Sequence, residues 1–294
     1  MYVMANELGL PNEGSIGMGW LRDLPDFRDY TLKTPSIKAL LNKIDFPKAL
    51  PASIDLSAWC APIENQGPLG SCTANAGVGL FEYFEKKASN SYIDASRLFL
   101  YKTTRNLLGL TGDTGAYLRT TAEAMLLFGV PPEKYYPYDT SKFDNEPAAF
   151  LYAFADNYKA LQYYRYDPPG TPKAQLLTAI KNNLSVGLPS MFGFTVYSSI
   201  SQAATSGSIP YPANGEKVLG GHAIDAVGFD DNKVITNTNN NKSTKGAFLI
   251  RNSWGTGWGN KGYGWLPYDY VTIGLASDWW SIIKAGWVDL GIFG

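Results

Sequence analysis

The sequence predicts an α+β protein with a helical first half and a strand-rich second half. In the first half apolar residues recur with helical spacing, most clearly in the run that follows residue 72. In the second half, short alternating runs lie between glycine-rich and polar segments, which is typical of strands. With 294 residues, 45% hydrophobic and 17% charged, the chain can bury a large core in one big domain or two medium ones.

Residues 1–50 are expected to form an N-terminal arm. Residues 14–30 are rich in glycine, proline and aspartate, and within the arm helical spacing is clear in 35–44. The start of the chain lacks a basic segment followed by an apolar core, and no apolar run reaches membrane length. We therefore expect no export signal and no membrane association, and favour an intracellular location unless the sequence has been trimmed.

Residues 51–165 are expected to form a mainly helical domain. Gly67, Pro68 and Gly70 predict a tight loop that ends where an apolar helix begins at Cys72. Further helices are expected at 96–108 and 116–128. A cysteine in the first turn of a helix lies near unpaired backbone N–H groups, which favour the thiolate over the thiol.

Residues 166–294 are expected to form the strand-rich domain. A helix should run from Thr171 to about Leu184. The expected strands are 190–197, 222–229, 247–252 and 262–266. The polar runs 230–233 and 237–245 are expected to be loops between strands.

Four residues together suggest nucleophilic catalysis. A Cys72 thiolate needs a proton acceptor, and the chain contains one histidine, His222, beside glycines that leave its ring uncrowded. Asn252 ends an apolar run and can orient an imidazole, and Gln66 lies six residues before Cys72. Taken singly, a lone cysteine, histidine or asparagine is more often structural. Unrelated structural needs would not produce all four residues in this order, so together they favour a catalytic role.

The order Gln66, Cys72, His222, Asn252, followed by the tryptophan- and glycine-rich run 252–259, resembles the papain-like (cathepsin-like) cysteine peptidases. The resemblance covers roughly residues 50 to 285. The Leu-Gly-Ser-Cys-Thr-Ala motif at 69–74 is similar to bacterial, archaeal and viral branches of that family.

The resemblance implies a papain-like fold, in which a helical left domain and an antiparallel β-barrel right domain enclose the active-site cleft. It implies peptide-bond hydrolysis through an acyl-enzyme on Cys72, with His222 as acid and base. Asn252 would hold the imidazole, and Gln66 would form the oxyanion hole with the Cys72 amide. The expected partner is a peptide or protein substrate, and the chain ends are expected to cross between the domains.

The same resemblance suggests substrate contacts at Gly115, Thr73, Gly221 and Trp254. Gly115 lies where the family has a glycine pair whose backbone pairs with the substrate. A helix-start turn capped by Asp113 or Thr114 is an equally good interpretation of that segment. Trp254 would also shield the contact between histidine and asparagine from water. The tyrosine-rich run 135–138 resembles a family feature, and we assign it no catalytic role.

Two departures from the family pattern affect expectations. Leu69 replaces a cysteine that usually forms a disulfide, and Thr73 replaces an aromatic residue next to the nucleophile. Neither removes a group needed for bond making, so we expect activity with altered specificity. A peptide ligase or transpeptidase on the same fold, a cell-wall amidase and a silent peptide-binding homologue remain as alternatives.

The arm has two interpretations. In the family, the segment before the domain commonly blocks the cleft until it is removed, which would make this chain a zymogen. An ordered arm that completes the fold is nearly as good an interpretation. Comparison of the N-termini of the wild type and Cys72→Ala after incubation would separate the two.

The remaining composition excludes several function classes. The formal net charge is −1 with interspersed signs, so we expect no binding to nucleic acid. Two cysteines argue against a disulfide framework; Cys60 is expected to be a small buried residue, although a Cys60–Cys72 bridge is conceivable. One histidine, two cysteines and scattered carboxylates give no metal set, and we expect no cofactor and a monomer.

Overall fold

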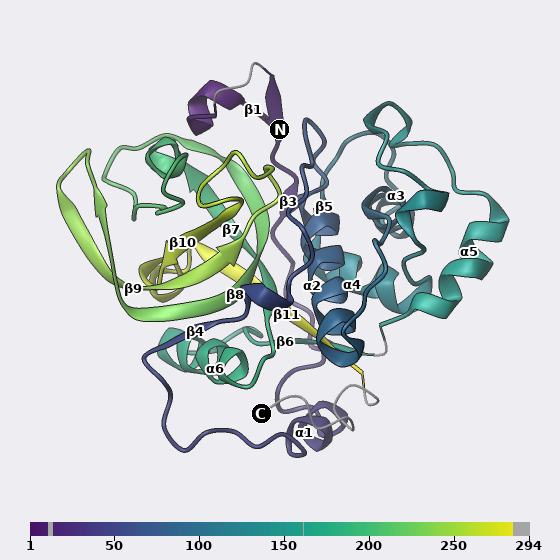
Figure 1. The fold of residues 1–294 in the computed structure, drawn as a ribbon, viewed down its shortest axis with the longest axis horizontal. Helices are drawn as coiled ribbons and strands as arrows, with labels where there is room; N and C mark the ends of the chain where they lie inside the picture. Colours follow the sequence, from purple (N-terminus) through teal and green to yellow (C-terminus); the bar gives the residue numbers. More distant parts are fainter. Residues whose placement is uncertain (11–13, 161, 285–294) are drawn as a thin grey trace.

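The computed structural model describes residues 1–10, 14–160 and 162–284. Helices gather on one side of the molecule and a curved antiparallel sheet forms the other, with the N-terminal arm passing between them (Figure 1). The predicted α+β class is confirmed, with a mainly helical part that comes before a strand-rich part in the sequence. No helix of the described residues is long and apolar enough to span a membrane.

The helical side is built around one buried helix. It comprises α2 (Cys72–Ser89), α3 (Arg97–Leu107), α4 (Leu118–Leu127) and α5 (Ala149–Ala155). Helix α2 is buried along its first thirteen residues because it packs against α3 and α4 on one side and the sheet on the other. The helix predicted from residue 116 begins two residues later, since Ala116–Tyr117 form the short strand β5.

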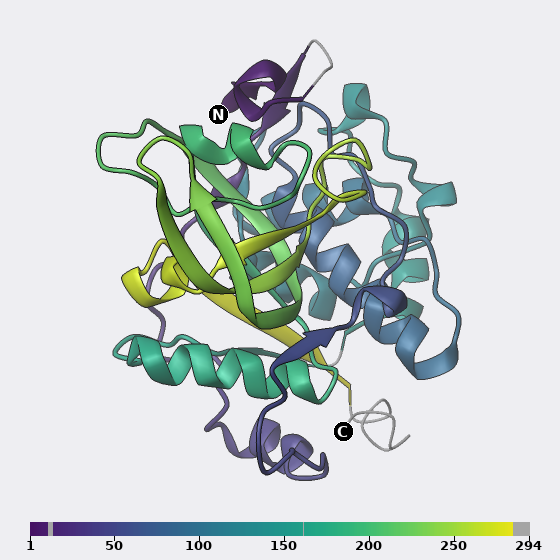
Figure 2. The same ribbon diagram turned by 60° about the vertical axis from the view of Figure 1, so that its left-hand side comes forward.

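The sheet has seven strands, in the order β10-β9-β8-β7-β11-β6, with β4 also paired to β8. Figure 2 shows how strongly it curves and how a helix lies beside it. The strands are β4 (Ser53–Asp55), β6 (Gln162–Arg165), β7 (Ser190–Tyr197), β8 (Val218–Asn237), β9 (Lys242–Arg251), β10 (Tyr263–Pro267) and β11 (Ala276–Ile283), with α6 (Lys173–Ser185) and α7 (Asp269–Ile273) alongside. Strand β4 precedes the helical part in sequence but joins this sheet through its pairing with β8.

The prediction that 230–233 and 237–245 are loops was wrong except for residues 238–241, which form the turn between β8 and β9. Strand β8 continues to Asn237 past an irregularity between Asp230 and Val234, and β9 begins at Lys242. The two strands form a long hairpin whose outer residues are largely exposed. Polar residues are compatible with an antiparallel ladder that faces water, and Thr236 and Ser243 share a hydroxyl hydrogen bond of 2.8 Å across it.

The arm is ordered and contacts both halves. Strands β1 (Tyr2–Met4) and β2 (Ser15–Gly17) pair with each other, and β3 (Trp20–Leu21) pairs in parallel with β5 of the helical side. Helix α1 (Pro35–Leu41) lies beyond α6 at the far end of the molecule (Figures 1 and 2). The arm therefore runs the length of the junction between the helices and the sheet.

Candidate active site

Cys72 is the first residue of α2, as predicted, and its side chain is completely buried. Its thiol lies within hydrogen-bonding reach of the backbone N–H of Ala223, the residue after His222, and of Gly19 in the arm. The loop before it is held by Asp113, whose carboxylate accepts a hydrogen bond of 2.9 Å from the Gly70 amide. The nucleophile candidate thus lies where α2, β8 and the arm meet.

His222 lies on β8 opposite Phe194 of β7 and is also completely buried. Its Nε2 is 2.8 Å from Asn252 Oδ1. Its Nδ1 has no hydrogen-bond partner among the described residues. The Trp254 ring stacks on the imidazole with centroids 4.6 Å apart, which excludes water from the contact between histidine and asparagine.

Gln66 is held at both ends of its amide. Its Oε1 accepts a hydrogen bond of 2.6 Å from the Ser253 hydroxyl, next to Asn252. Its Nε2 donates to the Leu69 carbonyl at 3.0 Å and to the Gly17 carbonyl of the arm at 2.9 Å. The donor expected to stabilise an oxyanion therefore binds a peptide carbonyl of the chain's own N-terminal arm.

The arm can approach the loop before Cys72 closely because residues 17 and 19 of the arm are glycines. A Cβ on Gly19 would lie 1.8 Å from the Gly70 carbonyl oxygen, and one on Gly17 would lie 2.2 Å from that of Leu69. Gly19 also accepts a hydrogen bond of 2.8 Å from the Ala116 amide. Glycines thus permit a backbone-to-backbone approach that other residues would prevent.

Burial under the arm shifts the pKa values of Cys72 and His222. Desolvation raises the pKa of the Cys72 thiol to about 11, although nearby backbone N–H groups oppose the shift. Desolvation lowers the pKa of His222 to about 4, against the effect of its bond to Asn252. At neutral pH both groups are uncharged in this covered form, because neither ion is hydrated.

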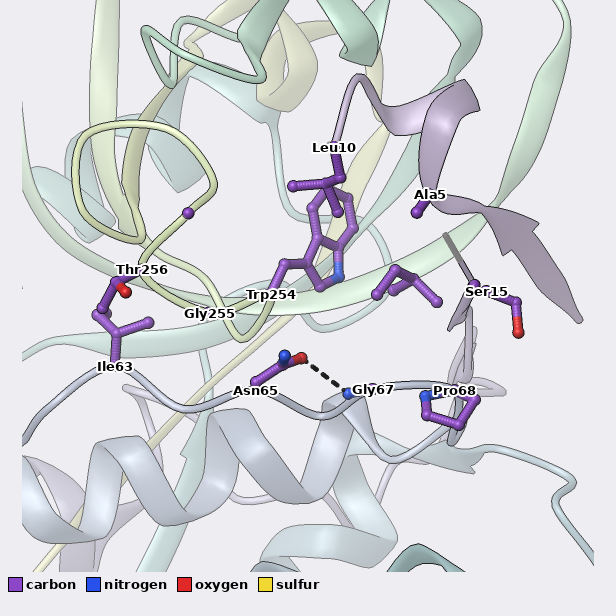
Figure 3. Close-up of a pocket in the computed structure, with 13 residues that line it drawn as sticks. Ala5, Leu10, Ser15, Ile63, Asn65, Gly67, Pro68, Trp254, Gly255 and Thr256 are labelled. Carbon is purple, nitrogen blue, oxygen red and sulfur yellow. Dashed lines mark hydrogen bonds between the residues drawn. The ribbon is translucent and has the colours of Figure 1, made fainter. Parts of the chain in front are cut away.

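One part of the cleft stays open. A cavity of about 750 Å³ lies between the arm's β1–β2 hairpin region and the loop that carries Trp254. Figure 3 shows Ala5, Leu10 and Ser15 on the arm side, and Ile63, Asn65 and Thr256 on the other. Solvent and small molecules can therefore approach the Trp254 end of the cleft while the arm is in place.

The structure brings most of the predicted substrate-contact residues to the arm. Gly115 has a left-handed φ of +75°, and a Cβ there would lie 2.3 Å from the Gly19 carbonyl oxygen. Gly221 lies against Trp20. The Thr73 side chain is instead fully buried within α2. The alternative interpretation, a helix-start turn capped by Asp113 or Thr114, was wrong, because α4 begins after Tyr117 without a side-chain cap.

Sequence reasoning missed three supporting residues. Ser253 holds the Gln66 amide, and Asp113 holds the loop before the nucleophile. Tyr138 donates a hydrogen bond of 2.9 Å to the Gln66 carbonyl and is 2.6 Å from the Ser71 hydroxyl. The tyrosine-rich run was visible in the sequence, but nothing there placed its last hydroxyl beside residues 66 and 71.

Cys60 and Cys72 are both free and buried, so the conceivable bridge between them is absent. The described residues contain no cluster of three or more histidine, cysteine, aspartate or glutamate side chains that could hold a metal ion.

Comparison with known proteins shows the family of the chain. The model of the papain family cysteine proteases matches residues 50–281. An uncharacterized peptidase C1-like protein of Acanthamoeba polyphaga mimivirus is 34% identical over 91% of this chain and 87% of its own. Cathepsin K of Gallus gallus is 28% identical over 74% of this chain and 59% of its own.

Among solved structures, xylellain, a cysteine protease from Xylella fastidiosa, has a TM-score of 0.71 and 32% sequence identity. The match covers 94% of this chain and 98% of that one, so it includes part of the arm as well as the two halves. The chain belongs to the papain family of cysteine proteases and is a hydrolase that acts on peptides or proteins.

Proposed function

We propose that Cys72 and His222 form the catalytic pair of this peptidase and that the N-terminal arm keeps the enzyme latent. The observation that carries the proposal is the hydrogen bond from Gln66 Nε2 to the Gly17 carbonyl, together with the complete burial of the thiol and imidazole. A substrate carbonyl needs the place that Gly17 occupies.

The reaction follows from the positions of the polar groups. Once the cleft is open, Cys72 Sγ attacks the substrate carbonyl carbon while Gln66 Nε2 and the Cys72 amide stabilise the oxyanion. His222 protonates the leaving amine as the C–N bond breaks, which yields a thioester. It then takes a proton from water, whose oxygen attacks the thioester and releases the acid and the thiol. Asn252 orients the ring throughout.

The arm is a poor substrate for its own active site. Gln66 binds the carbonyl of the peptide group that joins Gly17 to Met18, whereas the thiol is near the N–H of the next peptide group, at Gly19. Among the described residues, the oxyanion donor and the thiol thus contact different peptide groups of the arm. We infer that the arm covers the site in a register that disfavours its own cleavage.

Release of the arm should also activate the thiol. Burial is the main cause of the raised pKa of Cys72 and of the lowered pKa of His222. Water that enters the opened cleft reduces both shifts and allows a thiolate–imidazolium pair to form. The arm thus suppresses activity through protonation as well as through access.

The test compares the full chain with Cys72→Ala during incubation. We expect peptide cleavage and labelling of Cys72 by an epoxide reagent to rise together as mass spectrometry shows loss of Met1 and the arm. The Cys72→Ala chain should remain intact. A fully active wild type that keeps Met1 and an ordered arm would refute latency, while an unlabelled and inactive chain without its arm would refute the catalytic assignment.

A further inference from the structure

The loop that joins Gln66 to Cys72 carries both proposed oxyanion donors, the Gln66 side-chain amide at its start and the Cys72 backbone N–H at its end. Gly67 has a left-handed φ of +58°, and a Cβ there would meet open space, so packing does not fix the loop at this point. The arm supplies two contacts. Gly17 donates from its amide to the Gly67 carbonyl at 3.2 Å and accepts from Gln66 Nε2 at 2.9 Å. Both contacts would be lost on release of the arm.

Tyr138 links the two ends of this loop without the help of the arm. Its hydroxyl donates a hydrogen bond of 2.9 Å to the Gln66 carbonyl and lies 2.6 Å from the hydroxyl of Ser71, the residue before the nucleophile. Both Gln66 and Ser71 are completely buried. Tyr138 follows the short helix η3 (Glu133–Tyr135), so these contacts would persist once the arm has left.

The chemistry of the groups gives this network a single direction. A carbonyl oxygen can only accept, so Tyr138 gives its proton to Gln66, and the Ser71 hydroxyl must donate to the Tyr138 oxygen. The Ser71 hydroxyl oxygen accepts from Asn75 Nδ2 at 3.1 Å, and the same amide group donates to the Ser71 carbonyl at 3.0 Å. A one-way chain of three hydrogen bonds therefore runs from α2 to the Gln66 peptide group.

The ring of Tyr138 is held separately from its hydroxyl. The guanidinium carbon of Arg97 lies 4.1 Å from the ring centroid, and Arg97 binds Glu133 at 2.9 and 2.7 Å and Glu64 at 2.8 Å. Burial raises the pKa of Tyr138 to about 12, so the hydroxyl keeps its proton at neutral pH. A phenylalanine at this position would keep the ring contact and lose only the hydrogen bonds.

The other polar groups of Gln66 are fixed by Ser253 and by the loop itself. The Gln66 backbone N–H donates to the Ser253 carbonyl at 2.9 Å, and Oε1 accepts from the Ser253 hydroxyl at 2.6 Å. Nε2 donates one of its two hydrogens to the Leu69 carbonyl at 3.0 Å, which leaves the other for an incoming oxygen. Ser253 and Tyr138 therefore hold the Gln66 peptide from opposite sides and together direct its free N–H.

We propose that Tyr138 is a positioning residue for the oxyanion hole. By fixing the Gln66 carbonyl relative to Ser71, its hydroxyl sets the spacing between the two oxyanion donors. The inference rests on the proposed catalytic assignment. Without the hydroxyl, the Gln66 carbonyl would be a buried acceptor without this donor, which favours rotation of its peptide group. Such a rotation should affect turnover more than substrate binding, because donors of this kind are placed for the transition state.

The experiment uses the full chain with Gly19→Ala, which should displace the arm because its Cβ would lie 1.8 Å from the Gly70 carbonyl oxygen. Adding Tyr138→Phe removes the hydroxyl. We expect kcat for a chromogenic peptide to fall about tenfold, with KM changed less than twofold. Alkylation of Cys72 by iodoacetamide, a displacement at carbon that forms no oxyanion, should also change less than twofold.

Two further variants test the origin of the effect. Tyr136→Phe is the matched control, since it removes a hydrogen bond of 2.6 Å from a tyrosine hydroxyl to the Asn145 carbonyl, outside this loop. It should change neither rate. Ser71→Ala breaks the same link at its other end and should also lower kcat. Combined with Tyr138→Phe it should add little, because two members of one network are not additive.

An unchanged kcat in Tyr138→Phe would overturn the inference. Equal losses of kcat and of the alkylation rate would also overturn it, because they would show general disruption of the site. If Tyr138→Phe does not fold, Ser71→Ala decides through the same two rates. A Gly19→Ala chain that cleaves no peptide would instead refute the proposed function, and this inference with it.

Discussion

Gln66 and Gly17 share a hydrogen bond of 2.9 Å that joins the amide of an expected oxyanion donor to a backbone carbonyl of the arm. One amide group cannot hold the arm and stabilise an oxyanion in the same position at the same time. Under the proposed function, occupancy of the cleft by the arm and catalysis exclude each other, and the following predictions test this.

Gly19→Ala should expel the arm. Its Cβ would lie 1.8 Å from the Gly70 carbonyl oxygen, a backbone atom that cannot move aside easily. We expect epoxide labelling of Cys72 in the full chain to rise at least tenfold. Gly257→Ala is the matched control, since its Cβ would meet open space. Equal labelling of both variants would show that the arm does not limit access.

Asp29→Asn should loosen the arm at a second point. Asp29 binds Arg119 of α4 at 2.6 and 2.7 Å, and its side chain is only 4% exposed. Loss of a largely buried ion pair is costly because the remaining charge stays unpaired. We expect severalfold faster proteolysis of the arm. Asp26→Asn, which removes a local pair with exposed Arg28, should leave the rate unchanged.

Gln66→Ala should have opposite effects on the accessibility of Cys72 and on the turnover rate. The substitution removes the donor to Gly17, so labelling of Cys72 in the full chain should increase. It also removes the proposed oxyanion donor, a type of contact that contributes roughly 3 kcal/mol to transition-state stabilisation, so kcat should fall about a hundredfold. Turnover is measured in a Gly19→Ala background, where the arm no longer competes. An unchanged kcat there would remove Gln66 from the oxyanion hole.

His222→Ala should reduce kcat more than Asn252→Ala, in the same Gly19→Ala background. In the proposed mechanism the imidazole transfers protons in both steps, whereas Asn252 orients it through the 2.8 Å contact to Nε2. Single-turnover kinetics with a chromogenic peptide would measure both variants. Equal losses would mean that orientation of the ring by Asn252 is as important as the ring itself.

Titration of Asp278 should destabilise the covered form as the pH rises towards 7, while titration of His222 acts in the opposite direction. Burial raises the pKa of Asp278 to about 7, with the nearby Asp23 carboxylate acting in the same direction and Arg165 opposing it. Release of the arm hydrates Asp278 and removes Asp23, which lowers this pKa. At Asp278 the released form then binds fewer protons, so through this group a higher pH favours release between the ordinary aspartate range and about pH 7.

Hydrogen exchange of residues 15–25, corrected for the intrinsic rate at each pH, measures this opening. His222 has the opposite effect, because release of the arm raises its lowered pKa and the released form then binds a proton between about pH 4 and the ordinary histidine range. We therefore expect protection in the wild type, relative to Asp278→Asn, to decrease from pH 5 to pH 7.5. In Asp278→Asn the effect of His222 remains, so protection should rise with pH. The same pH profile in both chains would contradict the assignment to Asp278.

Structural elements that depend on residues close together in the sequence were predicted well. The loop before Cys72 and the helix after it follow from local spacing, and β7 was predicted with its observed bounds, Ser190–Tyr197. The hairpin formed by β8 and β9 was misjudged because polar composition alone does not distinguish a loop from a ladder that faces water. Pairing with a distant strand decides that question.

The sequence by itself determined the family, the α+β class and a small set of candidate catalytic residues, since a chain with one histidine leaves one imidazole to pair with Cys72. Only the tertiary structure decided what covers them. The contacts of Gly17 with Gln66 and of Trp20 with Asp278 join residues 49 and 258 positions apart. Local spacing carries no information on such contacts, because they depend on how the arm packs between the two halves.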